Sequence, residues 1–187
     1  MKIKSKGLLF TTLAALAIAI GVVSCKKDLL NVNVPMQMAE ITLTLPITPA
    51  AGEVTLPEDT IATNIDKFLS DNKIKKENIK SIKIESMVAT IVPDSSGQDT
   101  INNFRVMQNV KTELAAGSGS FFTLSEVSNI PNVPTYTLDL KPNKDTDYTS
   151  YFSSSLFRLR TTILTRSPIF KPIKMKVSIK LNLVGGV

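Results

Sequence analysis

The chain has 187 residues, with 22 lysine and arginine side chains against 16 acidic ones and a formal net charge of +6 at neutral pH. It contains no histidine and no tryptophan, and it has a single cysteine. The lack of histidine excludes Ser-His and Cys-His catalysis and histidine-based zinc sites, and the single cysteine excludes a disulfide framework within the chain.

The first element is an apolar run behind a basic N-terminus. Lys2, Lys4 and Lys6 occur without any acid nearby, and the 16 residues 8–23 are uncharged and mostly aliphatic. A basic segment followed by a short apolar segment is typical of a bacterial secretory signal. An uncleaved membrane helix is the alternative, but 16 residues at about 1.5 Å each span about 24 Å, less than the hydrocarbon core of about 30 Å. We therefore predict a signal peptide over residues 1–24.

The single cysteine, Cys25, directly follows this run in the sequence Val22-Val23-Ser24-Cys25. This sequence resembles the lipobox of bacterial lipoproteins. The resemblance implies cleavage between Ser24 and Cys25, a diacylglycerol thioether on the Cys25 thiol, and acylation of its amine. Two or more acyl chains anchor a protein stably, whereas one chain binds only marginally. The alternative is ordinary signal cleavage after Ser24, which leaves an unmodified thiol.

Removal of the signal changes the length and the charge of the chain. The mature chain from Cys25 has 163 residues, and loss of the three signal lysines leaves 19 basic against 16 acidic side chains, a net charge of +3. For an exported protein with this weak charge we expect no nucleic-acid partner. Residues 25–35 have no clear periodicity and end in Pro35, so we predict a lipidated N-terminus and flexible tether there, followed by one domain over residues 36–187.

Alternation of apolar and polar residues predicts that this domain is mainly β. The clearest case is Ile173–Leu183, where an apolar residue stands at every second position. The predicted strands, about eight in number, cover residues 41–47, 53–56, 79–92, 103–114, 121–127, 136–140, 157–163 and 173–183. Within 79–92 the apolar residues change parity, which predicts a bulge near Ser86.

Two short helical patterns interrupt the strands. The first covers residues 64–72, with Thr63 or Asn64 as its N-cap, and the second covers residues 148–156. One polar face on each strand and strands about ten residues apart favour a single antiparallel β-sandwich. A closed barrel is the alternative.

Several of these features together resemble one group of proteins. They are the lipobox, the lysine-rich tether, the threonine-rich first strand and the segment DKFLSDNKIKKENIKSIKIES at 66–86. In combination they are similar to small β-sandwich lipoproteins of the Bacteroidota cell envelope, many of which have no assigned activity. The resemblance implies a lipid anchor in the outer membrane. In such proteins, surface export is often associated with an acidic stretch just after the cysteine. Asp28 is the only acid in KKDLL, so the periplasmic and the surface-facing leaflet are both possible places for the anchor.

A basic run and an aromatic pair are candidate contacts for a ligand. The basic run consists of Lys73, Lys75, Lys76, Lys80 and Lys83. It fits an anionic glycan or a lipid headgroup, or it keeps a helix-to-strand connection soluble. Phe121 and Phe122 follow the loop sequence GSGS. Because neighbouring strand residues point to opposite faces, we expect only one of the two rings to enter the core.

The best metal candidate is a set of three oxygen-bearing side chains at alternate positions, Asn143, Asp145 and Asp147. Their spacing resembles the start of a calcium-binding loop. Tyr148 occupies the sixth position, where the calcium loop has glycine, and Ser154 occupies the twelfth, where it has glutamate. A turn rich in Asn and Asp that leads into the second helix is the alternative.

The leading hypothesis is a lipid-anchored, non-catalytic binding or accessory module without a cofactor, held to a membrane by its lipid and facing an unknown protein or glycan partner. A glycan-active hydrolase is one alternative, because glycosidases need only a pair of carboxylates. Its candidate acids are Glu85, Glu113, Glu126 and Asp139. The other interpretation of these acids is solvated charge on strand faces. A structural subunit of a surface fibre is the third hypothesis, and it requires an open groove or an exchangeable terminal strand.

Overall fold

The computed structural model of the protein describes residues 31–93 and 102–186. The chain divides into the units 1–30 and 31–187, and the described residues all lie in the second. The predicted signal peptide, Ser24 and Cys25 lie outside the described residues. Among the residues that are described, no helix is both long enough and apolar enough to cross a membrane.

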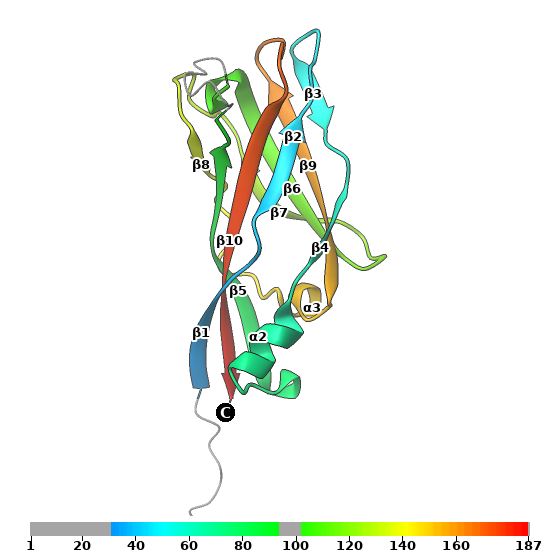
Figure 1. Cartoon of the computed structure of the whole chain (residues 1–187), viewed down its shortest axis with the longest axis vertical. Coiled ribbons are helices and arrows are strands. Elements are labelled where there is room, and N and C mark those ends of the chain that lie inside the picture. The colour runs from blue at the N-terminus through cyan, green and yellow to red at the C-terminus, as the bar shows by residue number, and fades with distance from the viewer. Residues whose placement is uncertain (1–30, 94–101, 187) are drawn as a thin grey trace, which may run out of the picture. The chain divides into compact units, whose positions relative to one another are not determined.

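In the described part of the chain, ten strands form two antiparallel sheets (Figure 1). The first sheet contains β1 (Asn31–Gln37), β2 (Ile41–Leu45), β5 (Ile79–Ile91), β8 (Thr137–Asp139) and β10 (Ile173–Gly186). The second contains β3 (Gly52–Thr55), β4 (Asp59–Ala62), β6 (Met107–Ala116), β7 (Phe122–Val127) and β9 (Leu156–Thr165). The predicted all-β antiparallel sandwich is therefore confirmed, and the barrel alternative is wrong because the strands form two separate sheets.

Strand β10 is the central strand of the first sheet and pairs with β1, β2 and β5. Its apolar residues are buried at every second position from Ile173 to Leu183, as the alternation predicts. Along one edge of β10, β2 pairs with its first half and β1 with its second half, from Ile173↔Leu45 to Asn31↔Gly186. At about 3.3 Å per residue, the 14 residues of β10 extend about 45 Å.

Strand β5 lies on the other edge of β10 and contains the predicted bulge. Lys180 pairs with Ser86, but the next residue of β10, Leu181, pairs with Ile84, which leaves Glu85 as the extra residue. The bulge moves the buried positions from Ile82 and Ile84 to Met87 and later odd-numbered residues. The parity change in the sequence therefore corresponds to a real irregularity in the ladder.

The strand β1 begins earlier than predicted. Residues 31–35, expected in the flexible tether, pair with β10 as part of β1, so the sheet starts five residues before the predicted domain boundary. Met36 is buried and Val34 packs against the core. Pro35 is tolerated because β1 is an edge strand, where a missing backbone N–H costs no ladder bond.

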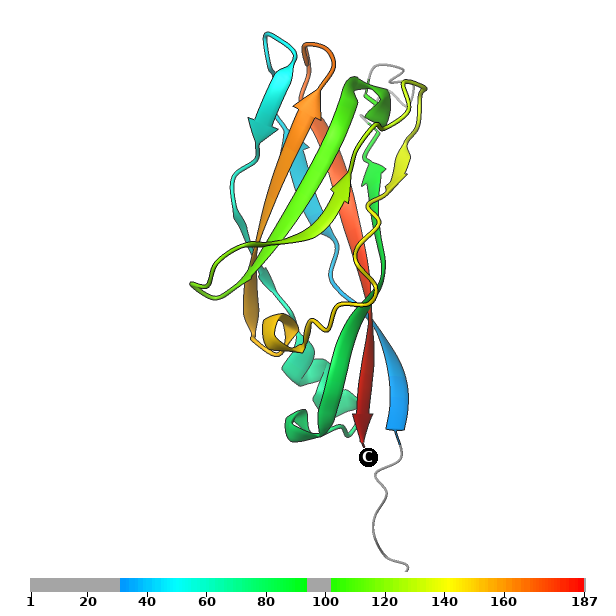
Figure 2. The ribbon, with the colours of Figure 1, turned by 180° about the vertical axis from the view of Figure 1, so that it is seen from behind.

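The helices α2 (Ile65–Asp71) and α3 (Thr149–Phe152) are both short, and α3 ends earlier than predicted because β9 begins at Leu156. Asn64 is the N-cap residue of α2, but its side chain makes no capping hydrogen bond. The helix α2 and the 3-10 turn η1 (Lys76–Asn78) lie at the end of the domain where β1 begins and β10 ends (Figures 1 and 2). A second 3-10 turn, η2 (Phe104–Val106), leads into β6.

Aromatic side chains close the sandwich beside α3. Phe152 packs edge-on against Phe157 of β9, with ring centroids 5.4 Å apart, and edge-on against Tyr148 at 6.2 Å. All three rings are fully buried. Such edge-to-face pairs are favourable beyond the area that they bury, so α3 is held by core packing although its four residues are too few for an independent helix.

Candidate functional site

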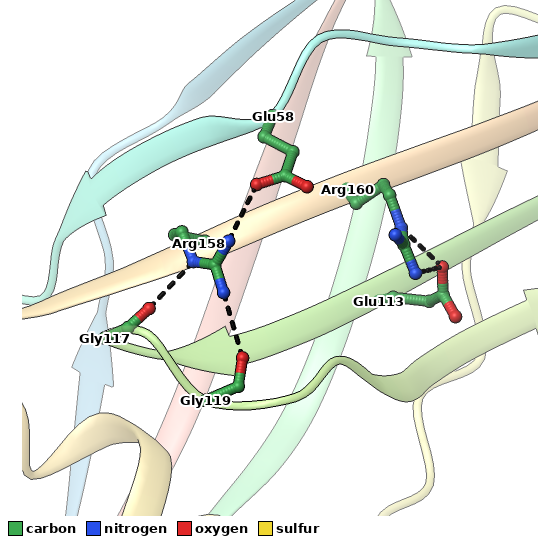
Figure 3. Close-up of polar contacts among 6 residues, drawn as sticks. All are labelled: Glu58, Glu113, Gly117, Gly119, Arg158 and Arg160. Atoms are coloured by element: carbon green, nitrogen blue, oxygen red, sulfur yellow. Dashed lines mark hydrogen bonds and ion pairs between the residues drawn. The ribbon is translucent and has the colours of Figure 1, made fainter.

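The outer face of the second sheet carries a polar cluster around Arg158 and Arg160 of β9 (Figure 3). Both side chains alternate with the buried Phe157 and Leu159, so the strand pleat turns them away from the core. Figure 3 shows Glu58, Glu113 and the loop of Gly117 and Gly119 around the two guanidinium groups. We call these residues, together with Phe121, the arginine cluster.

Each guanidinium group of the arginine cluster is bound to acceptors of the chain itself. Arg158 donates from Nε to the Gly117 carbonyl at 2.7 Å, from Nη2 to the Gly119 carbonyl at 2.9 Å, and from Nη1 to Glu58 Oε2 at 2.9 Å. Arg160 donates from Nε and Nη2 to one oxygen of Glu113, both at 2.9 Å. The cluster therefore fastens the loop between β6 and β7 to β9.

The aromatic pair divides between the two faces of the sheet, as predicted. Phe122 packs against the core, with its ring centroid 4.2 Å from that of Tyr151. The Phe121 ring lies on the outer face, where the guanidinium carbons of Arg158 and Arg160 are 4.8 and 4.2 Å from its centroid. Phe121 is half-buried under these cations, so its ring is engaged within the chain.

The candidate carboxylates lie on both sheets. Glu85 and Asp139 are in the first sheet, and Glu113 and Glu126 are in the second. Lys111 stands opposite Glu126 in the ladder and binds Glu113 Oε1 at 2.9 Å, so this cation lies beside both acids of the second sheet.

The charge state of Glu113 follows from its partners. The hydrogen bond from Lys111 is the main influence, and with the bonds and charge of Arg160 it outweighs the opposing effect of burial and lowers the pKa of Glu113. A carboxyl with a lowered pKa stays ionised at neutral pH and cannot donate a proton as a general acid. Glu113 is thus suited to hold the two basic side chains in place.

The side chains of the calcium candidate make turns. Asn143 Oδ1 accepts a hydrogen bond from the Asp145 amide at 3.0 Å. Asp147 Oδ1 accepts from the Thr149 amide at 3.0 Å, from the Thr149 hydroxyl at 2.6 Å and from the Ile82 amide at 3.1 Å. The bonds from the Asp145 and Thr149 groups are those of turns made by Asn and Asp, and the bond from the Ile82 amide joins the second of these turns to β5. No group of three or more His, Cys, Asp or Glu able to hold a metal ion occurs within 31–93 and 102–186.

The lysines of the basic run lie in the connection from α2 to β5 and at the start of β5. Lys73, with a φ of 57°, adopts the left-handed conformation after the helix. Lys76 forms an ion pair with Asp66 at 3.3 Å, whereas Lys73 and Lys75 are exposed and have no ion pair within the described part of the chain. The location agrees with a solvated connection, and it leaves the charge of two lysines open to solvent.

An exposed apolar pair at one end of the domain was not predicted from the sequence. Thr48 and Ile169 form an isolated bridge with N–O distances of 3.0 and 2.9 Å, which brings the neighbouring Ile47 and Phe170 to the same end of the domain. Ile47 is 60% exposed and Phe170 is 75% exposed. We call these two residues the apolar tip. The predicted strand 41–47 is shorter in the structure, because β2 ends at Leu45, before Pro46, and Ile47 lies outside it.

The cavities of the described residues differ in character. An enclosed space of about 10 Å³ lies in the core and is lined mostly by apolar residues together with Thr112 and Thr161. An open groove lies between β2 and the β3–β4 connection and includes one carboxylate, Asp59. Another open depression contains Arg105 and Arg166, and Arg166 donates to the carbonyls of residues 105, 107 and 130.

Comparison of the chain with protein-family models finds no match, and comparison with curated proteins finds none either.

Proposed function

We propose that the protein is a lipid-anchored lipoprotein of the bacterial cell envelope, whose β-sandwich is a non-catalytic binding or accessory module. The observation that carries the proposal is the sequence Val22-Val23-Ser24-Cys25 at the end of a basic and then apolar N-terminal segment. By resemblance to Bacteroidota lipoproteins, the membrane is the outer membrane. The anchor lies in either its periplasmic or its surface-facing leaflet.

The architecture of the domain supports this role. Only five residues separate Cys25 from Asn31, where β1 begins. At no more than about 3.6 Å per residue, this connection keeps the start of β1 within about 20 Å of the lipidated residue. The apolar tip lies near the opposite end of β10, about 45 Å along the strand. An anchored domain thus presents an exposed apolar pair, which suits contact with a partner, far from its anchor.

The polar groups of the domain support a non-catalytic role. The two guanidinium groups of the arginine cluster are bound to Glu58, Glu113 and backbone carbonyls. Their contacts are those of groups that stabilise a loop.

Matched variants of the two cleavage-site residues test the proposal. We expect the wild type and Ser24→Ala to be processed and recovered with the envelope membranes, since both keep a small residue before Cys25. We expect Cys25→Ser to lack the lipid, because a hydroxyl replaces the thiol that forms the thioether. Membrane fractionation and metabolic labelling with a fatty acid measure both properties. Labelled Cys25→Ser would contradict the proposal.

One observation favours the structural subunit of a surface fibre as a second candidate. The strand β1 is an edge strand near the start of the mature chain, and it covers one edge of β10 from Lys180 to Gly186. Its removal would leave that edge open to a strand from another copy. Electron microscopy of envelope preparations tests this candidate: filaments labelled by an antibody to the protein would support it, and labelled membranes without filaments would argue against it.

A further inference from the structure

We propose that the end of the domain that carries Lys73, Lys75, Lys76 and Lys80, here called the basic end, docks on the anionic phosphate headgroups of the membrane to which the protein is anchored. The inference rests on the proposed lipid anchor. It adds a second contact with the membrane and an orientation of the domain.

The basic end and the start of the domain lie side by side. Gly186 pairs with Asn31 on one side, and Gly185 pairs with Ile79 on the other. A Cβ added at Gly185 would meet Ile74 Cγ2 at 3.3 Å and the Asn78 carbonyl at 3.5 Å. Since neighbouring strands are about 4.8 Å apart, the start of β5 lies about 10 Å from the start of β1. Figures 1 and 2 show η1 and the starts of β1 and β5 at the same end of the domain.

The short connection keeps this end of the domain close to the proposed anchor. Five residues link Cys25 to Asn31, so the start of β1 lies within about 20 Å of a lipidated cysteine. The basic end is about 10 Å to the side of that point, and lysine side chains extend toward a surface on flexible stems. The opposite end, with the apolar tip, is about 45 Å away along β10.

The charge of the mature chain is concentrated at this end. The segment 66–83 has six lysines and three acidic residues, a net charge of +3. The mature chain from Cys25 also has a net charge of +3, so its remaining residues sum to zero. Two of the three acids are already engaged, since Asp71 pairs with Lys67 at 2.6 Å and Asp66 with Lys76 at 3.3 Å. Exposed Lys73 and Lys75 thus carry charge that complements an anionic lipid surface.

The magnitude follows from the lysines that are open to solvent. Each lysine close to an anionic membrane surface contributes about 1 kcal/mol. Replacing Lys73 and Lys75 by glutamine therefore shifts the equilibrium between docked and undocked domain by about 30-fold at low salt. At molar salt the Debye length falls to about 3 Å, so the contact is lost.

Lysine footprinting of the mature protein reconstituted in vesicles tests the proposal. The rate of acetylation of each lysine is measured by mass spectrometry on vesicles of phosphatidylcholine alone and of phosphatidylcholine with phosphatidylglycerol. We expect Lys73, Lys75 and Lys76 to react severalfold more slowly on the anionic vesicles, and to recover in high salt. Lys171 and Lys174, near the apolar tip, serve as internal references and should not change.

A matched pair of variants separates docking from simple proximity. In Lys73→Gln/Lys75→Gln, the protection of Lys76 on anionic vesicles should disappear. In Lys171→Gln/Lys174→Gln, which removes the same charge from the opposite end, it should persist. Equal acetylation rates on the two kinds of vesicle, or protection that survives in Lys73→Gln/Lys75→Gln, would overturn the proposal.

The same digest distinguishes this inference from the proposed function. The mass of the N-terminal peptide reports whether Cys25 is acylated. If Cys25 is unmodified, the lipid anchor fails, and the footprint is measured with the unmodified chain and excess vesicles. Protection of the basic end on anionic vesicles would then support the headgroup contact without the anchor, and its absence would refute that contact.

Discussion

Two buried threonines on β9 provide a direct test of how polar groups contribute to the stability of this domain. Thr161 and Thr165 both face the core and are equally buried, each 2% exposed. The Thr161 hydroxyl has no hydrogen-bond partner among the described residues. The Thr165 hydroxyl accepts from the Gly52 amide at 3.1 Å and donates to the Gly52 carbonyl at 3.2 Å. The same substitution should therefore have opposite effects at the two positions.

The magnitudes follow from the hydrogen bonds. An unsatisfied buried hydroxyl costs about 1–3 kcal/mol, whereas each hydrogen bond contributes about 0.5–1.5 kcal/mol. Valine has nearly the shape of threonine. We expect Thr161→Val to raise the free energy of unfolding by about 1 kcal/mol, and Thr165→Val to lower it by about 1–2 kcal/mol. For a domain of this size, 1 kcal/mol corresponds to about 2–4 °C in melting temperature.

The assay is urea unfolding followed by far-UV circular dichroism, which needs no tryptophan. If the slope of the free energy of unfolding against urea concentration is the same in all variants, the substitutions change the stability and not the surface that is exposed on unfolding. If Thr161→Val lowers the free energy of unfolding as much as Thr165→Val does, the inference that the Thr161 hydroxyl is unsatisfied is wrong.

Three further predictions concern the polar contacts. Arg158→Gln removes the bonds to the loop carbonyls, so amides at 117–121 should exchange hydrogen faster by mass spectrometry; Arg160→Gln, which keeps those bonds, is the control, and equal exchange in both variants would contradict the reasoning. Burial opposes ionisation of Asp147, but the hydrogen bonds of Thr149 and Ile82 and the charge of Lys83 outweigh it and lower the pKa of Asp147. Because its pKa is lowered, ionised Asp147 stabilises the fold at pH values above its unfolded pKa of about 4, and this stabilisation is lost as the pH falls through the folded pKa. Asp147→Asn should therefore be less stable than the wild type at pH 7 and should lose less stability on acidification. Parallel profiles of stability against pH for the two proteins would refute this. Calcium or EDTA should leave the melting temperature unchanged, because the oxygens of Asn143 and Asp147 accept amide hydrogens; a rise with calcium would favour the metal site.

The sequence predicts the central strands well because their pattern is set by burial. Alternation from Ile173 to Leu183 survives in β10 since one face of that strand meets the core along its whole length. The bulge near Ser86 is visible because a change of parity is the direct consequence of one extra residue. Strands at the edge are harder to recognise. Val32, Val34 and Met36 alternate in β1, but the run is short and contains Pro35, which usually argues against a strand.

The surface features were predicted less completely because they depend on contacts between distant parts of the chain. The sequence predicts that one ring of Phe121 and Phe122 faces outward, but not that Arg158 and Arg160 cover it, since these residues are 37 or more positions further along the chain. Likewise, the bridge that pairs the neighbours of Ile47 and Phe170 joins segments far apart in sequence. The basic run was visible in the sequence, but its position beside the start of β1 required the topology.

The most direct test of the proposed anchor is the intact mass of the mature protein purified from its native membrane. A lipoprotein begins at Cys25 and exceeds the mass of the polypeptide 25–187 by a diacylglycerol group, with a further acyl chain where the amine is modified. A mass equal to that of the unmodified polypeptide, or an N-terminus at any other residue, would contradict the anchor and the envelope role inferred from it.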